Sequence, residues 1–465
     1  MKQQKLFGTS GIRGYAEETS APDYISLTDS FCYAITRAFL AYAAPQSRKG
    51  VFAIGMDLRP SSPHIKDAVI QAITDEGCDV SFQGITPTPA LAYYVKEKKC
   101  AGGIMITGSH IPEHMNGIKF FLPSGEILKD DEAALEKIYA ELEHITPLVR
   151  ANAVAESSDA NSLYTELLRK HAVKITHTKQ RPFNGLKVVV DGRSSCQSLV
   201  IPGVLRLLGA TVHELPPADR FIAVDTEKTT AHPELAAALK EHNADVGVVY
   251  DGDGDRVVFY QKDGTLIVPD VICTLIARNP SFEAIVTPIN VSSVIDCLNK
   301  EVVRTKVGAP YVVSQMKQLL AEGTKCFGFE SNGGSIFGDY HFSRDGGIPT
   351  IEVLNWLRHR PLHEVRKDVP VYHQLKDKFD CPTALNEPIL ERCQQEFIAK
   401  FDDHVAGVET MDGVKILFKN NAWILFRPSQ NAPEFRIFTE ARTKEQAEYL
   451  MNMGTEFVKG IMVSA

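Results

Sequence analysis

Hydrophobic and polar positions follow one another along the chain in blocks that predict strands, turns and helices. Apolar residues recur at helical spacing between Phe31 and Tyr42, which predicts a helix there. A short apolar run over 51–55 then leads into a polar turn, and a helical pattern over 66–76 ends at Gly77. The order of strand, turn and helix predicts a parallel α/β sheet in this part of the chain.

The same block pattern occurs again further along. An apolar run over 186–190 leads into Asp191, just as the run over 51–55 leads towards Asp57, and a helical pattern follows in both places. A third, fainter copy begins with the apolar run 284–287. We interpret these copies as duplicated α/β units, and chance similarity between generic α/β units is the alternative.

The C-terminal tail has a different pattern. Three short apolar segments, 414–418, 423–426 and 435–438, predict strands, and Thr443 with Gln446 predicts a capped final helix. This order indicates an α+β domain with an antiparallel sheet. We expect linkers near 150–160 and 360–371.

Composition and charge narrow the class of protein. The 465 residues are 44% hydrophobic and 23% charged, as in ordinary globular chains, and this length predicts about three domains. The net charge of −8 argues against a nucleic-acid partner. The nine cysteines are scattered without a Cys-x-x-Cys pair, which favours reduced thiols in the cytoplasm. We find neither a signal peptide nor an apolar stretch of spanning length, so we expect no membrane partner.

The strongest single motif is an acidic loop. Residues 251–256 read Asp-Gly-Asp-Gly-Asp-Arg and follow the apolar run 246–250. Three carboxylates on alternate residues, with flexible glycines between them, can surround a hard cation such as Mg²⁺ or Ca²⁺. An EF-hand would need glycine at Arg256 and glutamate at Lys262, so that class of site is excluded. A solvated acidic turn is the alternative.

A candidate nucleophile lies in a second loop. Residues 107–112 read Thr-Gly-Ser-His-Ile-Pro and follow the apolar run 103–106. Ser109, beside His110, is a candidate nucleophile or phosphate carrier, with a plain turn as the alternative. Lys119 stands among apolar residues, which favours burial, a lowered pKa and proton transfer; an ordinary lysine that reaches solvent is the alternative.

Three further loops carry groups that suit a phosphorylated sugar. Residues 427–436 read Arg-Pro-Ser-Gln-Asn-Ala-Pro-Glu-Phe-Arg, which predicts a phosphate clasp, with a surface salt-bridge loop as the alternative. Residues 7–14 form a glycine-rich loop in which Arg13 is available for an anion. Residues 328–334 read Gly-Phe-Glu-Ser-Asn-Gly-Gly and put an acid and an amide on a turn, where sugar hydroxyls can be held.

In order and spacing, these five loops resemble those of the α-D-phosphohexomutase superfamily, and the resemblance covers essentially the whole chain. It implies an α/β enzyme with four domains around a central cleft, of which three are related α/β mixed-sheet domains and the last is α+β. The implied domains are 1–152 with the phosphoserine loop, 153–258 with the metal loop, 259–368 with the sugar loop and 369–465 with the phosphate loop.

The resemblance also implies a role for each matching residue. Ser109 would carry the transferred phosphate, and Ser109, Asp251, Asp253 and Asp255 would bind Mg²⁺. Lys119 would be the acid–base residue, with Arg13 and His110 lining the reacting end. The other matches would bind the substrate: Thr9, Ser10, Arg256, Glu330, Asn332, Arg427, Ser429, Asn431 and Arg436.

The implied activity is that of a Mg²⁺-dependent phosphohexomutase, an intramolecular phosphotransferase of the isomerase class. Phospho-Ser109 would donate to O1 or O6 of a hexose monophosphate, and the resulting hexose 1,6-bisphosphate would turn over in the cleft and return its other phosphate. That bisphosphate would be both intermediate and activator. The expected partner is a small hexose phosphate, and we expect a monomer or a homodimer.

Three loops depart from the usual family pattern. The serine loop has Gly108 where alanine is usual, and the sugar loop has Gly334 where many relatives have histidine, which leaves one acid–base partner unassigned. The phosphate loop reads Ser-Gln-Asn-Ala-Pro in place of Ser-Gly-Thr-Glu-Pro. These variants look most like a bacterial phosphomannomutase branch, so we expect mannose phosphates, and also glucose phosphates, as substrates.

Three other functions are weighed against this one. Phosphoglucosamine mutase also resembles the segment 116–121, although its sugar loop fits less well. A phosphatase of the haloacid-dehalogenase type, with Asp251 or Asp253 as nucleophile, would leave the serine loop and the phosphate clasp unexplained. A non-catalytic sugar-phosphate binding protein would have no use for Ser109 and Lys119.

Overall fold

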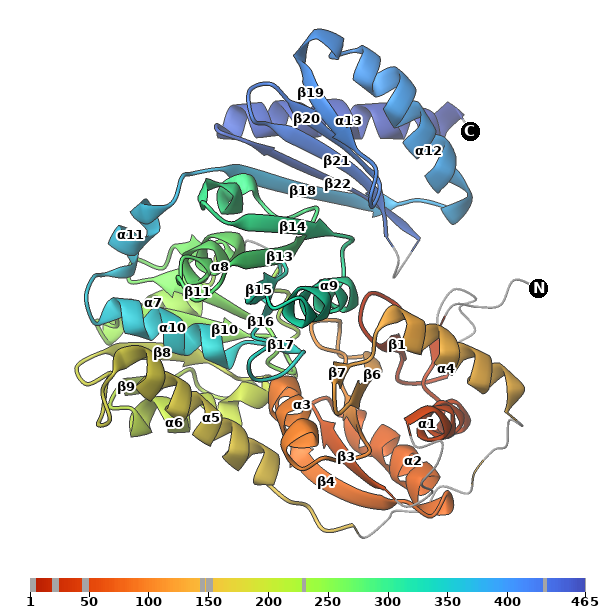
Figure 1. Ribbon diagram of the computed structural model, residues 1–465, viewed down its shortest axis with the longest axis vertical. Helices are drawn as coiled ribbons and strands as arrows, with labels where there is room; N and C mark the ends of the chain where they lie inside the picture. The colour runs from red at the N-terminus through yellow and green to blue at the C-terminus, as the bar shows by residue number, and fades with distance from the viewer. Residues whose placement is uncertain are drawn as a thin grey trace.

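The computed structural model describes residues 6–18, 25–43, 50–142, 147, 154–227, 231–429 and 433–464. Four sheets with helices against them follow one another along the chain (Figure 1). Asn431, one of the expected substrate-binding residues, lies outside the described residues. Within those ranges, no helix combines the length and the apolar character that crossing a membrane requires.

The first sheet has the strand order β2-β1-β6-β5-β3-β4, and β7 pairs with β6. The helix expected between Phe31 and Tyr42 is confirmed as α1, and the one expected over 66–76 is confirmed as α2 with an earlier start. The bounds are β1 Ile12–Tyr15, β2 Ile25–Ser26, α1 Asp29–Ala43, β3 Val51–Met56, α2 Ser62–Asp75, β4 Asp79–Ile85, α3 Thr88–Glu97, β5 Gly102–Ile106, β6 Met115–Leu122, β7 Gly125–Glu126 and α4 Lys129–Glu141.

The second and third sheets have the orders β12-β11-β10-β8-β9 and β14-β13-β15-β16-β17. The elements of the second sheet and its helices are α5 Asp159–Thr176, β8 Lys187–Asp191, α6 Ile201–Leu207, β9 Thr211–Glu214, α7 Pro233–Glu241, β10 Val246–Tyr250, β11 Val257–Gln261 and β12 Leu266–Ile267. Those of the third sheet and its helices are α8 Pro269–Ala277, β13 Ala284–Pro288, β14 Glu301–Thr305, α9 Ala309–Ala321, β15 Cys326–Phe329, β16 Ser335–Ile336, β17 Arg344–Asp345, α10 Gly347–Leu357 and α11 Leu362–Val365.

These three sheets share one path, which confirms the repeat read from the sequence. In each, the first strand (β3, β8 or β13) pairs in parallel with the second and the third strands. The third strand (β5, β10 or β15) then pairs antiparallel with the fourth. Because the carboxyl ends of parallel strands meet at one edge of a sheet, the loops after the first and third strands are neighbours.

The last sheet is antiparallel throughout, with the order β18-β22-β21-β20-β19. Its elements are β18 His373–Asp380, α12 Asn386–Arg392, β19 Val405–Glu409, β20 Val414–Phe418, β21 Trp423–Pro428, β22 Glu434–Ala441 and α13 Lys444–Ser464. The three expected strands and the final helix are confirmed, and Thr443 Oγ1 accepts a bond from the Gln446 N–H. The two edge strands, β18 and β19, were not predicted from the sequence.

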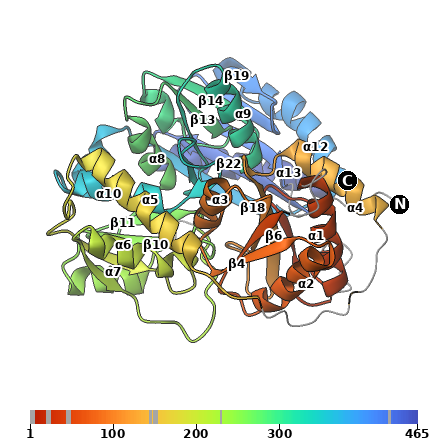
Figure 2. The same cartoon turned by 60° about the horizontal axis from the view of Figure 1, so that its bottom comes forward.

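The sheets are joined to different extents. The second and third share one apolar core, in which Val188 and Val248 of one belong with Ile285 and Phe327 of the other. The last sheet has a core of its own and meets the third through a small cluster of Ile289, Trp423, Leu425 and Phe438. Figure 1 shows this last unit set apart from the other three, and Figure 2 shows it behind them.

Candidate functional site

The serine loop connects β5 to β6 at the edge of the first sheet. Ser109 is fully buried and has a φ of +54°, in the left-handed region that non-glycine residues rarely adopt. Its N–H donates to Thr107 Oγ1 at 2.8 Å, which helps to fix the turn. Its Oγ donates to Asp251 Oδ2 at 2.7 Å and lies 3.4 Å from His110 Nδ1. The structure therefore brings the predicted carrier onto the predicted metal loop.

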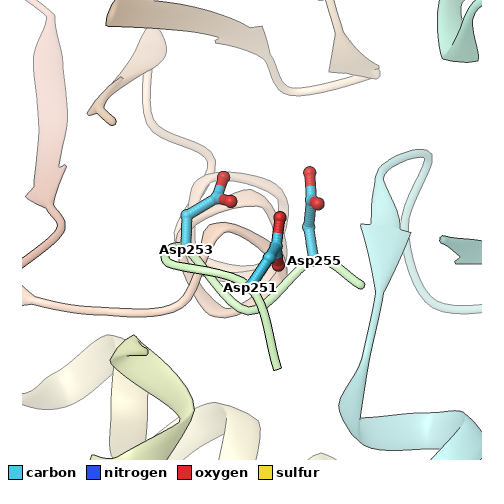
Figure 3. Close-up of side chains that lie close together, drawn as sticks. All are labelled: Asp251, Asp253 and Asp255. Carbon is cyan, nitrogen blue, oxygen red and sulfur yellow. The ribbon is translucent and has the colours of Figure 1, made fainter. Parts of the chain in front are cut away.

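Three carboxylates converge on the loop after β10. Asp251, Asp253 and Asp255 are fully buried, and one oxygen from each lies within 4.8 Å of the others. Figure 3 shows the three side chains rising from the same side of the loop. Asp253 Oδ1 and Asp255 Oδ1 are buried without a hydrogen-bond partner in the described part of the chain. Buried carboxylate oxygens without donors are what a hard divalent cation binds, so these residues fit one.

Lys119 reaches the metal loop from β6. Its neighbours Ile118 and Phe120 face the apolar core of the first sheet, so the alternation of a strand turns Lys119 to the other face. Its fully buried Nζ lies 2.5 Å from Asp253 Oδ2 and 2.7 Å from Asp255 Oδ2. The ammonium group thus balances two carboxylates of the triad, and the plain alternative of a lysine that reaches solvent is wrong.

Charge is distributed unevenly over the triad. Burial, together with Asp253 and Asp255, raises the pKa of Asp251 to about 8. Burial acts the same way on Asp255, but Arg344, Lys119 and Arg256 outweigh it and hold the pKa of Asp255 well below its usual range. Asp251, which accepts the Ser109 hydroxyl, is thus the carboxylate least supported by cations.

Arg13 of the N-terminal loop, His110 of the serine loop and Arg256 of the metal loop were expected to line the reacting end. Arg256 Nε lies 3.8 Å from Asp251 Oδ2 and 3.7 Å from Asp255 Oδ1, and its Nε and Nη1 have no hydrogen-bond acceptor among the described residues. Arg13 Nη1 donates to Thr107 O at 2.6 Å. Burial, with Arg256 nearby, lowers the pKa of His110 well below its usual value.

Arg344, at the start of β17, is a site residue that the sequence analysis missed. Its guanidinium group donates to Asp255 Oδ2 at 2.8 Å, to Glu330 Oε2 at 2.9 Å and to Ser10 Oγ at 3.2 Å. One buried side chain therefore ties together the metal, sugar and N-terminal loops. A Cβ at Gly334 would lie 2.4 Å from Arg344 Cδ, so Arg344 fills the space beside Gly334.

The sugar loop lies beside these groups. Glu330 and Asn332 are both buried, and the Asn332 carbonyl accepts a bond from Thr226 Oγ1 at 2.6 Å. Ser10 Oγ donates to Glu126 Oε1 at 2.5 Å, so this residue belongs to the support of the loops as well as to the expected binding set.

The phosphate clasp spans the ends of β21 and β22. Arg427 is 1% exposed, and its Nε donates to Asp412 Oδ2 at 2.7 Å. Arg436 Nη2 donates to Glu434 Oε2 at 3.3 Å. Arg427 Nη2 and Arg436 Nε are buried N–H donors that have no acceptor within the described ranges. Donors held in place without acceptors suit an anion.

One cavity of about 560 Å³ connects the clasp with the reacting end. It is lined by residues from all four sheet units, among them Thr9, His110, Glu227, Arg256, Glu330, Asn332, Arg344, Lys376, Arg427, Ser429 and Arg436. Most of the expected substrate-binding residues are therefore gathered around one space. Ser109 is covered, and its neighbour His110 forms part of the wall.

Glu227 is a second lining residue that sequence reasoning missed. Its carboxylate pairs with Lys376 on β18 and lies 3.8 Å from Arg256 Nη1. Burial opposes ionisation, but Lys376, Arg256 and His110 hold the pKa of Glu227 far below its usual range. An anionic side chain thus stands between the cations of the reacting end and those of the last sheet.

Comparison with known proteins agrees with this arrangement. Residues 4–146, 162–264 and 269–372 match alpha/beta/alpha domains I, II and III, respectively, of the phosphoglucomutase/phosphomannomutase family. The chain is 33% identical to a phosphomannomutase of Sinorhizobium fredii, covering 98% of this chain and 99% of that one. It is 31% identical to a probable phosphoglucosamine mutase of Methanosphaera stadtmanae, with 98% and 99% covered.

The fold has solved counterparts. The crystal structure of a putative phosphomannomutase from Thermus thermophilus superposes with a TM-score of 0.76 at 24% identity, covering 99% of this chain and 100% of that one.

The chain belongs to the phosphoglucomutase/phosphomannomutase family, within the α-D-phosphohexomutase superfamily. It is a mutase of the isomerase class with the four-domain phosphohexomutase fold.

Proposed function

We propose that this mutase interconverts mannose 6-phosphate and mannose 1-phosphate, and also the corresponding glucose phosphates, through a phosphorylated Ser109 and a hexose 1,6-bisphosphate. The observation that carries the proposal is the contact of 2.7 Å between Ser109 Oγ and the buried carboxylate triad. Arg427 and Arg436 line a cavity that His110 lines as well, and each has a buried donor without an acceptor among the described residues. A carrier at one end and an anion site at the other suit a sugar with two phosphorylated positions.

The chain's own residues would divide the work of binding. Arg427, Ser429 and Arg436 grip the phosphate that does not react, and Asn431 is proposed to join them. Glu330 and Asn332 hold ring hydroxyls, with Thr9 and Ser10 nearby. His110, Arg13 and Arg256 surround the reacting end.

The transfer step exchanges one phosphate ester for another. The O–P bond of phospho-Ser109 breaks as a bond forms from phosphorus to O1 or O6 of the sugar. The proton of that sugar hydroxyl moves to Ser109 Oγ, and Lys119 is the residue proposed to relay it. After the bisphosphate turns over, the same exchange runs in reverse at its other phosphate. Closing of the cleft around the substrate would exclude water and protect the phosphoserine between the two steps.

Asp251, Asp253, Asp255 and Ser109 would hold a Mg²⁺ ion. When bound, the ion supplies positive charge that offsets the charge of the transferred phosphoryl group. Lys119 and Arg256, already beside the triad, add to that offset.

Phosphoglucosamine mutase is the second candidate function. The observation that favours it is the comparable identity, 31% against 33%, of relatives with the two names. Both activities use the same phosphate chemistry, so they differ only in the group at C2 of the sugar.

A substrate panel tests the proposal. Purified enzyme with Mg²⁺ and a catalytic amount of hexose 1,6-bisphosphate is assayed on mannose, glucose and glucosamine 1-phosphates, and kcat/KM is compared. We expect mannose 1-phosphate to be preferred, and equal or dominant turnover of glucosamine 1-phosphate would overturn that choice.

Ser109→Ala tests the carrier, with Ser162→Ala on the exposed face of α5 as a matched control. We expect Ser109→Ala alone to remove turnover. Phosphopeptide mapping of the unsubstituted enzyme should find phosphate on Ser109. Phosphate on an aspartate instead would favour the haloacid-dehalogenase type of chemistry, and no turnover of any hexose phosphate would favour a binding protein.

We further propose the domain boundaries 1–152, 153–258, 259–368 and 369–465, which the three family matches support at 4–146, 162–264 and 269–372. A cytoplasmic location is also proposed, because all nine cysteines are unpaired thiols and most are buried.

A further inference from the structure

Arg59, in the turn after β3, is the most heavily bonded side chain around the serine loop. It is 1% exposed. Its Nη1 donates to the carbonyls of Pro112 and Met115 at 2.6 and 3.0 Å, and its Nη2 donates to those of Ser109 and Ile111 at 3.0 and 2.5 Å. Four carbonyls of one loop therefore converge on a single guanidinium group.

Asp57 fixes this guanidinium from the other side. Asp57 Oδ2 accepts from Arg59 Nε at 3.2 Å and from the Gly108 N–H at 3.2 Å. Asp57 Oδ1 accepts from the Arg59 N–H and from Ser62 Oγ. The ring of Phe221 covers the guanidinium at 4.5 Å. Each of the five N–H groups of Arg59 can thus be assigned an acceptor, so the side chain has no freedom to move.

The second repeat contains the same Asp-x-Arg motif, but its arginine does not bind the carbonyls of a neighbouring loop. Arg193 binds Asp191 much as Arg59 binds Asp57, through both its N–H and its Nε. Its outer nitrogens, however, pair with Asp191 and Glu234 rather than with a loop. The metal loop is held instead by its own neighbours, Cys196 N to Gly252 O at 2.9 Å and Gln197 Nε2 to Gly254 O at 2.9 Å.

Gly108, the residue before Ser109, lies directly against the Arg59 side chain. A Cβ at Gly108 would lie 2.4 Å from Arg59 Nε and 2.5 Å from its Cζ. Because the guanidinium is held on every side, it cannot retreat from an added methyl group. The absence of a side chain at Gly108 leaves the space that Arg59 occupies.

We infer that Arg59 is a positioning residue that holds the backbone of Ser109 in its left-handed conformation and so aims Ser109 Oγ at Asp251. The inference rests on the proposed role of Ser109 as phosphate carrier. Arg59 itself contacts the carbonyl of Ser109 and not its hydroxyl, so it acts through the loop. Without it, four carbonyls lose a common donor and the loop loses the geometry that the transfer needs.

The test measures how fast, and how completely, Ser109 is phosphorylated by hexose 1,6-bisphosphate, using rapid quench and mass spectrometry. In Arg59→Lys a charge remains, but three donors cannot reach four carbonyls and Asp57. We expect the phosphorylation rate and kcat to fall about 100-fold with KM nearly unchanged, since a displacement of about 1 Å has that effect. The matched control Arg193→Lys should keep the unsubstituted rate.

A merely structural role predicts a different result. It would lower the fraction of enzyme that becomes phosphorylated, together with the melting temperature, and leave the rate of the remaining fraction unchanged. Either that pattern or an Arg59→Lys rate equal to that of Arg193→Lys overturns the positioning role. If the unsubstituted enzyme never carries phosphate on Ser109, the proposed function fails and the inference fails with it.

Gly108→Ala gives a second, independent measurement. Alone, it should slow phosphorylation of Ser109 because its methyl group meets the fixed guanidinium. Combined with Arg59→Lys, it should add little, since the group that it displaces has gone. Fully additive effects on the rate would contradict the inference.

Discussion

The two ends of the cavity hold their charges in opposite ways. At the reacting end, Lys119 lies directly against Asp253 and Asp255, and Arg344 lies against Asp255, so cations and carboxylates from this chain neutralise one another. At the clasp, Arg427 and Arg436 each have one carboxylate partner and each retain a buried donor without an acceptor in the described structure.

We expect this difference to give the two ends different tasks. A ligand at the clasp completes bonds that already have their donors in place, so binding there costs little rearrangement. At the reacting end, each change of charge must redistribute partners inside a buried network, where an unpaired charge is expensive. We therefore expect substitutions at the reacting end to affect turnover and stability, and substitutions at the clasp to affect KM.

Lys119→Met should produce the largest effect, because it breaks the neutral network. Removal of the ammonium group leaves the buried Asp253 without its cation and Asp255 with its arginines alone, which should lower the free energy of unfolding by about 3–5 kcal/mol. We also expect kcat to fall by about 10²–10⁴-fold through loss of proton transfer. Urea unfolding and steady-state assays measure the two effects. Lys170→Met on the exposed side of α5 is the control, and a kcat within a few-fold of it would contradict the proposed role.

Mg²⁺ should stabilise the reacting end by an amount that depends on Asp251. At a concentration about 100 times its dissociation constant, an ion that binds only the folded state contributes about 2.7 kcal/mol. Thermal unfolding with Mg²⁺ or with EDTA measures this difference. Asp251→Asn should abolish the stabilisation, whereas Asp263→Asn, in the exposed turn after β11, should preserve it. Equal stabilisation of both variants would place the ion elsewhere.

Arg427→Lys tests the expected effect of a clasp substitution on KM. Lysine cannot bind Asp412 and a phosphate in the forked geometry of arginine, and a bond to a charged group contributes about 1.5–3 kcal/mol. We expect KM for the hexose phosphate to rise roughly 10–100-fold while kcat changes little. Arg392→Lys on exposed α12 serves as the control. A fall in kcat without a change in KM would contradict the division between the two ends.

Glu227→Gln should produce the smallest effect, because this residue lies between the two ends. Its pair with Lys376 is partly exposed, and such pairs contribute about 0.2–1 kcal/mol. Removing the negative charge frees Lys376 and Arg256 for an anionic ligand, so we expect KM to fall a few-fold. The fall should shrink at high salt. An increase in KM would indicate that Glu227 binds the substrate itself.

The parts of the fold that the sequence predicts are those with local signals. The run 186–190 becomes β8 and the run 414–418 becomes β20, because buried strands need continuous apolar residues. β18 could not be predicted in this way, because it is an edge strand. Its charged residues interrupt the apolar pattern; they are Lys376, Asp377, Lys378 and Asp380.

Some residues of the candidate site can likewise be predicted from the sequence, and others cannot. Ser109 and the three aspartates stand in short motifs after apolar runs, so the sequence alone points to them. Arg344 and Asp412 have no such motif, and the Asp-x-Arg motif of Arg59 does not show which loop the arginine binds. Each of the three acts through a partner in another loop or another sheet unit. Arg344 reaches Asp255 from a different sheet, and Asp412 accepts from the Val307 N–H as well as from Arg427. Contacts of that kind exist only once the chain has folded.

The complete burial of Ser109 bears on the lifetime of the phosphorylated enzyme. A phosphate ester closed off from solvent is hard for water to attack. If Ser109 is the carrier, each turnover returns a phosphoryl group to it, so the enzyme should stay phosphorylated through many substrate turnovers. The enzyme would then need its bisphosphate as an occasional recharge rather than as a second substrate, and a few molecules of it would keep a large pool of enzyme active.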